Sequence, residues 1–170
     1  MSAYQTVTRS YDYPVGARDA RHLPELSGLD FLRALQAGEI PPPSFGSTLD
    51  VEGIVELAEG LVVFRATPAA FHLNPIGTVH GGYAATLLDS CMGCAIHSAL
   101  PAGMAYTTAE LKVNYIRAMT PDTGPVRAEG RVIHVGRTMA TSEGRLVGEA
   151  DGRLYAHGST TCLVFPAKPA

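Results

Sequence analysis

The sequence predicts an α+β domain in which a curved six-stranded antiparallel sheet wraps around one long central helix, with a short helical extension at the N-terminus. Three observations predict this fold. A long apolar segment with helical period lies in mid-chain, two strand-like runs precede it, and four strand-like runs follow it. With 170 residues, 46% of them hydrophobic and 17% charged, the chain can build one core, and a second domain is not expected.

The first 45 residues are expected to form an extension outside the main domain. Ser27 and Asp30 have the spacing of a capping box, which predicts a short helix at about residues 28–37. Gly38 and the prolines at 41–43 end this helix. The main domain is then expected at residues 46–166, with a tail at 167–170.

Period-two patterns predict a hairpin first, with strands at about 47–58 and 61–67 joined across Glu59-Gly60. From Gly82 to about Ala99 the period lengthens to that of a helix, which is apolar nearly all round and therefore must be covered by other elements. Four further strands are expected at about 104–117, 125–135, 138–149 and 153–165. The last two are joined at Asp151-Gly152, which suits a type I′ turn and favours an antiparallel sheet.

Charge and composition exclude several classes of partner. The net charge of −3 gives no electrostatic reason to expect nucleic acid or an anionic membrane surface. No segment reaches the roughly 18 apolar residues of a membrane span, and the polar N-terminus lacks the pattern of a signal peptide, so a cytoplasmic location is expected. Cys91, Cys94 and Cys162 suit reduced core thiols, and neither a metal nor a cofactor is expected.

Asp89 is a single acid within the apolar helix. An unpaired carboxylate costs several kcal/mol to bury, so Asp89 needs a partner, water or a chemical role. The helix opens on His80-Gly81-Gly82, and side-chain-free residues at a helix N-terminus expose backbone N–H groups that can bind negative charge. These residues mark a candidate site.

Three separated motifs occur in order along the chain. They are Asn74 with His80-Gly81-Gly82 and Asp89, then the run from Thr108 to Tyr115, then Val135-Gly136-Arg137-Thr138. Over about residues 46–166 this pattern resembles the hotdog-fold acyl-CoA thioesterases of the PaaI (phenylacetate-degradation) type. The resemblance implies a hotdog fold and the hydrolysis of an acyl-CoA thioester to a carboxylic acid and coenzyme A.

The resemblance also implies roles for individual residues. The His80-Gly81-Gly82 turn forms the oxyanion hole, where a backbone donor such as the Gly81 N–H is typically worth about 10²–10³ in rate. Asp89 acts as nucleophile or as general base, and a poorly solvated carboxylate suits either role. Asn74 and His80 position the carbonyl or a water. Gly136, Arg137 and Thr138 contact the pantetheine and phosphates of coenzyme A.

Two neighbouring residues, Thr107 and Thr108, are candidates for the hydroxyl that supports Asp89. The family motif matches Thr108, whereas strict strand alternation places Thr107 on the apolar face of its strand. Thr107 would serve an acid of its own subunit, and Thr108 an acid of a partner subunit.

Distance along the helix predicts a shared site. Gly82 and Asp89 are seven residues apart, or about 10 Å at about 1.5 Å per residue. An attacking group and the oxyanion donors must lie within roughly 3–4 Å of one carbon atom. One chain therefore cannot supply both, which predicts an obligate homodimer with antiparallel central helices. The resemblance also implies shared sites, and it makes a dimer of dimers plausible.

Other interpretations stay open. Asp89 could pair with a buried hydroxyl, His80 could bond the loop, Asn74 could form an Asx-type turn, and Arg137 could be solvated. A non-catalytic module that binds acyl-CoA is the alternative function, and a hotdog hydratase or dehydratase is a more distant one. The acyl group is also open, since the candidate pocket residues suit aryl and aliphatic groups alike: Tyr83, Met92, Leu100, Met104 and Tyr106.

Overall fold

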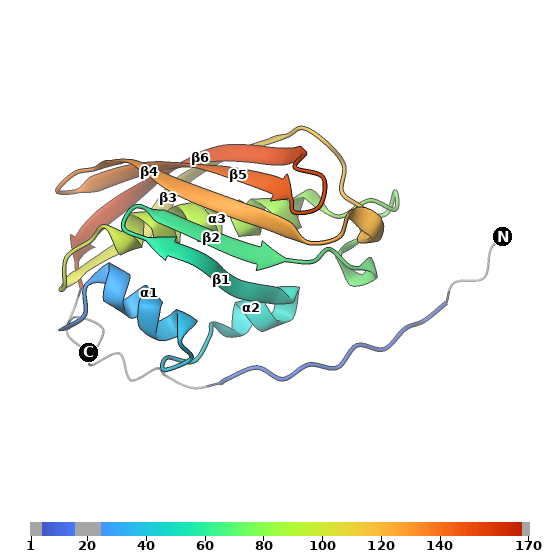
Figure 1. Ribbon diagram of the computed structural model, residues 1–170, viewed down its shortest axis with the longest axis horizontal. Helices are drawn as coiled ribbons and strands as arrows, with labels where there is room; N and C mark the ends of the chain where they lie inside the picture. Colours follow the sequence, from blue (N-terminus) through green and yellow to red (C-terminus); the bar gives the residue numbers. More distant parts are fainter. Residues whose placement is uncertain (1–4, 16–24, 168–170) are drawn as a thin grey trace.

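The computed structural model describes residues 5–15 and 25–167, in which a curved antiparallel sheet surrounds one long helix (Figure 1). The six strands are β1 (Val51–Ala58), β2 (Leu61–Ala66), β3 (Met104–Tyr115), β4 (Val126–Val135), β5 (Met139–Gly148) and β6 (Leu154–Pro166). Their order across the sheet is β1-β2-β4-β5-β6-β3, and the predicted fold class is confirmed. Residues 1–4 and 16–24 of the predicted extension and 168–170 of the predicted tail lie outside the described residues.

The central helix α3 spans Gly81–Ser98, one residue earlier at each end than predicted. Its core side chains, among them Leu88, Met92 and Ile96, are fully buried against the sheet. β4 passes so close that a Cβ atom added at Gly130 would lie 2.3 Å from the Cys91 carbonyl oxygen. Only a residue without a side chain allows this approach. No helix in the described part of the chain is long and apolar enough to cross a bilayer.

One stripe of α3 is not covered within a single chain. Thr86, Asp89 and Ser90 are partly exposed, whereas Leu87, on the sheet side of the helix, is buried. The expectation of a helix covered nearly all round is therefore only partly met by one chain.

The short helix α1 covers the C-terminal end of α3. It spans Gly28–Gln36, and the Ser27 hydroxyl accepts a hydrogen bond from the Asp30 N–H at 3.2 Å, which confirms the predicted cap. The Gly28 N–H donates to the carbonyl of Leu100 at 3.0 Å, just beyond the end of α3. This contact ties the extension to the central helix.

The predicted start of the first strand at residue 47 is wrong, because a second short helix, α2, spans Ser44–Leu49. Pro43 enters this helix in an extended conformation, and Asp50 ends it in the left-handed region at φ 57°. The turn at Asp50 delays β1 until Val51. The predicted domain boundary at 46 therefore falls inside α2.

The two edge strands of the sheet differ in how well they are protected. β1 has two register irregularities and packs against α1 and α2. β3 is 12 residues long, pairs only with β6, and has exposed residues from 107 to 110. A long edge strand without cover is a template for pairing with another chain.

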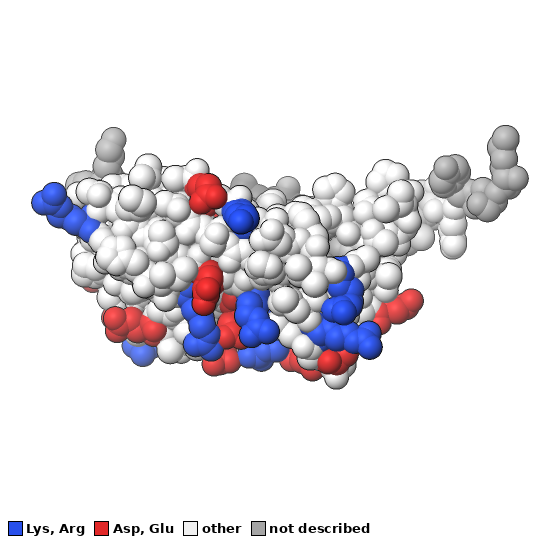
Figure 2. Space-filling model, turned by 90° about the horizontal axis from the view of Figure 1, so that it is seen from above, with Lys and Arg blue, Asp and Glu red and all other residues white. Residues whose placement is uncertain are grey.

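Charged side chains gather on one side of the molecule (Figure 2). In and next to the sheet, Arg65 forms ion pairs with Glu52 and Glu149, and Arg127 pairs with Glu56 at 2.9 Å. Exposed pairs of this kind contribute about 0–1 kcal/mol each. The opposite side in this view carries few charges.

Candidate active site

The turn before α3 fixes which backbone donors are free. His80 is the N-cap of α3, and its Nδ1 accepts a hydrogen bond from the Gly82 N–H at 2.9 Å. A neutral His80 that accepts at Nδ1 carries its proton on Nε2. The Gly81 N–H makes no hydrogen bond within the described residues. Of the two predicted oxyanion donors, only the Gly81 N–H is free, because the cap occupies that of Gly82.

Neighbouring atoms restrict both glycines. A Cβ atom at Gly82 would lie 2.9 Å from His80 Nδ1, so a side chain there would displace the capping ring. A Cβ atom at Gly81 would lie 3.1 Å from the ring of Tyr115, which is 57% exposed and can move aside. Gly82 is thus needed for the cap, whereas Gly81 tolerates a small side chain more readily.

Asn74 organises the loop that leads into the turn. Its side-chain oxygen accepts from the N–H groups of Ile76 and Thr78, at 3.0 and 3.2 Å. Its amide nitrogen donates to the Thr78 hydroxyl at 2.8 Å. Within one chain, Asn74 therefore serves as a turn residue, as the alternative interpretation of this residue predicted. One amide N–H remains without a partner in the described residues.

Asp89 lies two turns further along α3 and is held by one hydroxyl. Thr108 Oγ1 donates to Asp89 Oδ1 at 2.9 Å, whereas Thr107 makes no bond to the acid. The reason is an irregularity in β3. Thr108 pairs with Cys162 but Glu110 with Thr161, so that Ala109 is an extra residue. Such a bulge reverses the alternation of side chains.

The bulge changes which residues of β3 face the helix. Met104 and Tyr106 pack toward α3 before it, and Leu111 and Val113 do so after it. The expectation that Thr107 lies on the apolar face of its strand is therefore wrong. Thr108 holds the acid of its own subunit, not an acid of a partner as the alternation implied.

The surroundings of Asp89 include protonated thiols. Burial raises the pKa of the Cys94 thiol to about 12 and holds the pKa of Cys91 well above its ordinary value. Burial also raises the pKa of Cys162, and the nearby Asp89 charge adds to this effect. Neither of the C-x-x-C thiols therefore supplies a thiolate. Among the described residues, no group of three or more His, Cys, Asp or Glu side chains is arranged to hold a metal ion.

The third motif lies at the other end of the helix. Gly136, Arg137 and Thr138 form the turn between β4 and β5, and their neighbours Val135 and Ala140 pack near Ile96 at the C-terminal end of α3. Arg137 is exposed and makes no hydrogen bond or ion pair within the described residues. Within one chain, this turn and Gly81 therefore lie at opposite ends of α3.

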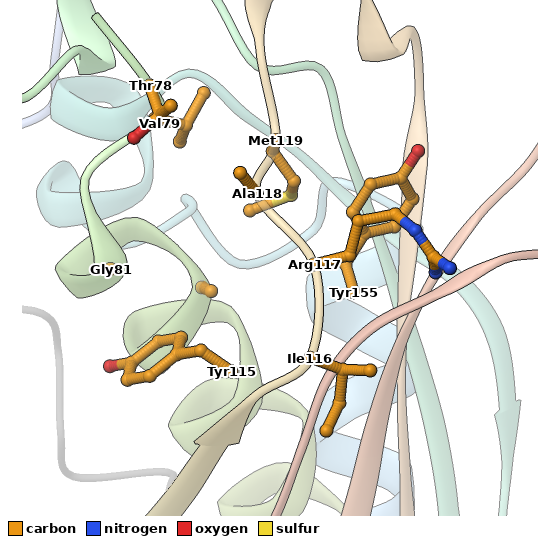
Figure 3. A pocket seen from close by; sticks show the side chains of 10 residues that line it. Thr78, Val79, Gly81, Tyr115, Ile116, Arg117, Ala118, Met119 and Tyr155 are labelled. Atoms are coloured by element: carbon orange, nitrogen blue, oxygen red, sulfur yellow. The ribbon is translucent and has the colours of Figure 1, made fainter. Parts of the chain in front are cut away.

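Two pockets flank the turn before α3. The first, of about 300 Å³, is lined on one side by Gly81 and Tyr115 and on the other by residues 116–119 (Figure 3). The second, of about 360 Å³, lies against His80, Gly82, Tyr83 and Thr86. Of the residues expected to line an acyl pocket, Tyr83 borders the second, whereas Met92 and Leu100 are buried in the core.

Sequence reasoning missed two groups near the turn. Tyr115 has no predicted role beyond ending the second motif, yet its ring lies against Gly81. Phe45 and Phe71 line the second pocket from segments with no recognised motif. Only the aromatic character of these residues, next to an irregular segment, offered a signal.

Comparison with known proteins identifies the family. Residues 76–155 match the profile of the Thioesterase superfamily. A Caenorhabditis elegans protein named as a putative esterase is 33% identical over 68% of this chain and 67% of its own length. Human acyl-coenzyme A thioesterase 13 is 29% identical over 64% of this chain and 76% of its own length. A protein from Halobacterium salinarum, also named as a putative esterase, is 43% identical over 44% of this chain. This match spans only 49% of the length of that relative.

Among solved structures, a phenylacetic acid degradation-related protein from Ralstonia eutropha, described as a putative thioesterase, superposes with a TM-score of 0.70. It is 26% identical, and the match covers 78% of this chain and 98% of that one. The wrapped helix and these matches define the hotdog class of thioester hydrolases. The chain belongs to the thioesterase superfamily, and the predicted resemblance to its PaaI-type members is confirmed.

Proposed function

We propose that the protein hydrolyses acyl-CoA thioesters in sites shared by two chains. The observation that carries this proposal is that two functional groups lie at different positions along α3. A free backbone donor, the Gly81 N–H, starts the helix, and Asp89, held by Thr108, lies about two turns further on. The superfamily and the name of the human relative support a CoA thioester as substrate.

The Gly81 N–H stabilises the oxygen of the thioester as it gains charge. It lies at the N-terminus of an 18-residue helix, where the helix dipole also favours negative charge. One such donor is typically worth about 10²–10³ in rate. The Nε2–H of His80 and the second amide N–H of Asn74 are the side-chain donors that position the carbonyl or a water beside it.

Asp89 supplies the basic or nucleophilic group. Because Thr108 donates to Oδ1, the other oxygen is left for chemistry. As general base, Asp89 takes a proton from water while the water oxygen attacks the thioester carbon. As nucleophile, it forms an anhydride that water then cleaves. In both routes the carbon–sulfur bond breaks, coenzyme A leaves as the thiolate, and the thiolate takes up a proton.

A second chain brings the two halves of each site together. The uncovered edge of β3 and the uncovered stripe of α3 offer a surface for an antiparallel copy. In that arrangement the Asp89 of one chain approaches the Gly81 of the other. The Gly136-Arg137-Thr138 turn, at the C-terminal end of its own α3, then reaches the partner's α3 N-terminus, where Arg137 binds phosphates. A dimer of dimers and a cytoplasmic location stay predictions.

The test is release of a free thiol from a panel of acyl-CoA substrates, followed with a thiol-reactive dye. We expect hydrolysis by the wild-type protein and a loss of about 10²–10⁴ in kcat for Asp89→Asn. Tight acyl-CoA binding without hydrolysis would show a binding module instead. Addition of water across an unsaturated acyl group, with no thiol released, would show a hydratase.

A further inference from the structure

The pocket beside His80 and Gly82 has an outer wall that the N-terminal segment builds. We call it the α2 pocket. Phe45 and Leu49 of α2 form this wall, Phe71, His72 and Leu73 form the wall beside it, and Tyr83 and Thr86 of α3 form the floor. Aromatic and aliphatic side chains therefore dominate a space of about 360 Å³ that opens at the candidate oxyanion turn. This composition suits an apolar ligand group.

The α2 helix cannot hold this wall by itself. It has six residues, none of them buried, and Pro43 provides no side-chain cap. Helices this short are unstable in isolation. On its inner side, the His72 Nε2–H donates to the Leu49 carbonyl at 3.0 Å, while His72 Nδ1 accepts from the Ala69 N–H. One anchor of α2 therefore comes from the neighbouring wall.

Arg9, from the segment at residues 5–15, provides the second anchor. Its guanidinium donates to the carbonyls of Thr48 and Ser47 at 2.9 and 3.1 Å and lies 3.7 Å from the Asp50 carboxylate. A cation is favoured at the negative C-terminal end of a helix. The same guanidinium lies 4.0 Å from the centre of the Phe71 ring, within cation–π range. Arg9 thus joins α2 to Phe71 in the neighbouring wall of the α2 pocket.

The floor of the α2 pocket contains an unsatisfied polar group. Tyr83 is 3% exposed, and its hydroxyl has no hydrogen-bond partner among the residues that the structure describes. Burial raises the pKa of Tyr83, so this hydroxyl stays a protonated donor. A buried donor without an acceptor is costly unless water or a ligand supplies one. The buried hydroxyl belongs to a residue that lines the α2 pocket, so a polar group of a ligand or a water would have to approach it from the pocket side to satisfy it.

We propose that the α2 pocket binds the acyl group of the thioester and that Phe45 and Arg9 set the size of acyl group it accepts. This inference rests on the proposed function. A thioester carbonyl at the Gly81 N–H has the acyl group on one side and the pantetheine on the other. The turn has one pocket on each side. In the α2 pocket, Phe45 and Leu49 come from a segment that lies outside the superfamily match at residues 76–155.

Two substitutions at Phe45 test the size limit in opposite directions. Phe45→Ala enlarges the α2 pocket, and we expect kcat/KM for acyl groups above the wild-type optimum to rise roughly tenfold. Phe45→Trp fills the pocket. We expect kcat/KM for the largest acyl group that the wild type accepts to fall roughly tenfold, while kcat/KM for acetyl-CoA stays unchanged. Phe45 is 58% exposed, so both variants should fold. Val55→Ala, at a 42% exposed apolar residue of β1, is the matched control.

Arg9→Ala tests whether the anchor holds the wall. We expect it to shift the preferred acyl size upward, as Phe45→Ala does, since α2 loses its C-terminal contacts. Arg33→Ala is the control, because Arg33 pairs with Asp30 at 3.1 Å on the surface of α1, away from the pocket. Thermal unfolding of each variant shows that the fold is retained.

The affinities of non-hydrolysable acyl-CoA thioethers and of coenzyme A itself, measured by calorimetry, separate the outcomes. The inference is supported if the dependence of affinity on acyl size changes in the Phe45 and Arg9 variants while the affinity for coenzyme A stays the same. This holds even if no thioester is hydrolysed. An unchanged profile overturns it, and hydrolysis by the same proteins would leave the proposed function intact. Equal changes for coenzyme A and all thioethers would also overturn it, because the pocket would then hold the coenzyme.

Discussion

At the scale of single residues, the contact between Thr108 and Asp89 decides how the acid is presented. A hydrogen bond to an ionised acceptor is roughly twice as strong as one between neutral groups. At 2.9 Å it fixes one carboxylate oxygen and thereby orients the other. Because Asp89 is partly exposed in one chain, this orientation matters more than burial for its chemistry. Thr108 is a positioning residue in this interpretation.

Thr108→Val should lower kcat roughly 10–100-fold, because the variant keeps the shape of the side chain but loses a hydrogen bond worth about 1.5–3 kcal/mol. Thr108→Ser keeps the hydroxyl and should restore most of the rate. The neighbouring Thr107→Val removes an equally exposed hydroxyl that does not touch the acid, and its kcat should match wild type. Steady-state kinetics on one acyl-CoA compare all three, and equal losses at 107 and 108 would contradict the assignment.

At the scale of elements, α3 and the sheet are joined through their backbones. Gly130 of β4 lies against the carbonyl of Cys91, and Gly144 of β5 lies against the side chain of Met92. The Ser142 hydroxyl donates to the Met92 carbonyl at 3.0 Å within the same contact. These small residues let the strands approach the helix closely, and the Ser142 hydrogen bond joins the two elements at this contact.

Gly130→Ala should therefore destabilise the fold by about 1–3 kcal/mol, since the new methyl group would meet fixed backbone atoms of α3. Gly46→Ala in α2 is the control, because outside its own helix no atom of the described residues lies within 4 Å of its added Cβ, and alanine favours a helix. Urea unfolding at one protein concentration measures both variants. A Gly130→Ala variant as stable as wild type would show that β4 and α3 do not approach as described.

Long, periodic elements were predictable from the sequence, and the details of the site were less so. The apolar period gave α3 to within one residue, because burial on nearly all sides leaves few alternatives. The face of Thr108 was not predictable, because one extra residue at Ala109 reverses a strand. The helix α2 was missed for a related reason. Tertiary contacts from Arg9 and His72 stabilise it, and no local signal in residues 44–49 does.

The sequence also showed which turn opens α3, but not which of its donors is free. That depends on the orientation of the His80 ring, whose Nδ1 accepts the Gly82 N–H. A histidine before two glycines is compatible with either outcome. Positions of functional residues are therefore easier to predict from a sequence than the hydrogen bonds that complete them.

At the scale of the whole molecule, the site is incomplete in one chain. Gly81 and Asp89 are eight residues apart on one continuous helix, or about 12 Å along its axis. The turn at 136–138 lies at the far end of the same helix. An antiparallel partner brings these groups together twice, once in each of two equivalent sites.

Two variants that each disable one half of the site test this arrangement. Gly81→Pro removes the donor N–H, and proline suits this first helical position. His80, at φ −61° and ψ 136°, already has the extended conformation that precedes a proline. Gly81→Ala keeps the N–H and meets the same Tyr115 ring, so it separates crowding from loss of the donor. The second disabling variant is Asp89→Asn.

Mixing inactive Gly81→Pro and Asp89→Asn chains after mild dissociation should restore about a quarter of wild-type activity, since half of the dimers are mixed and each mixed dimer has one intact site. Chains that carry both substitutions provide the reverse test. Mixed with wild-type chains, they should inactivate both sites of every mixed dimer if the sites are shared, whereas separate sites would leave the wild-type half active. Thiol release after re-equilibration measures both mixtures. No recovery in the first mixture, together with proportional dilution in the second, would place each active site within a single chain.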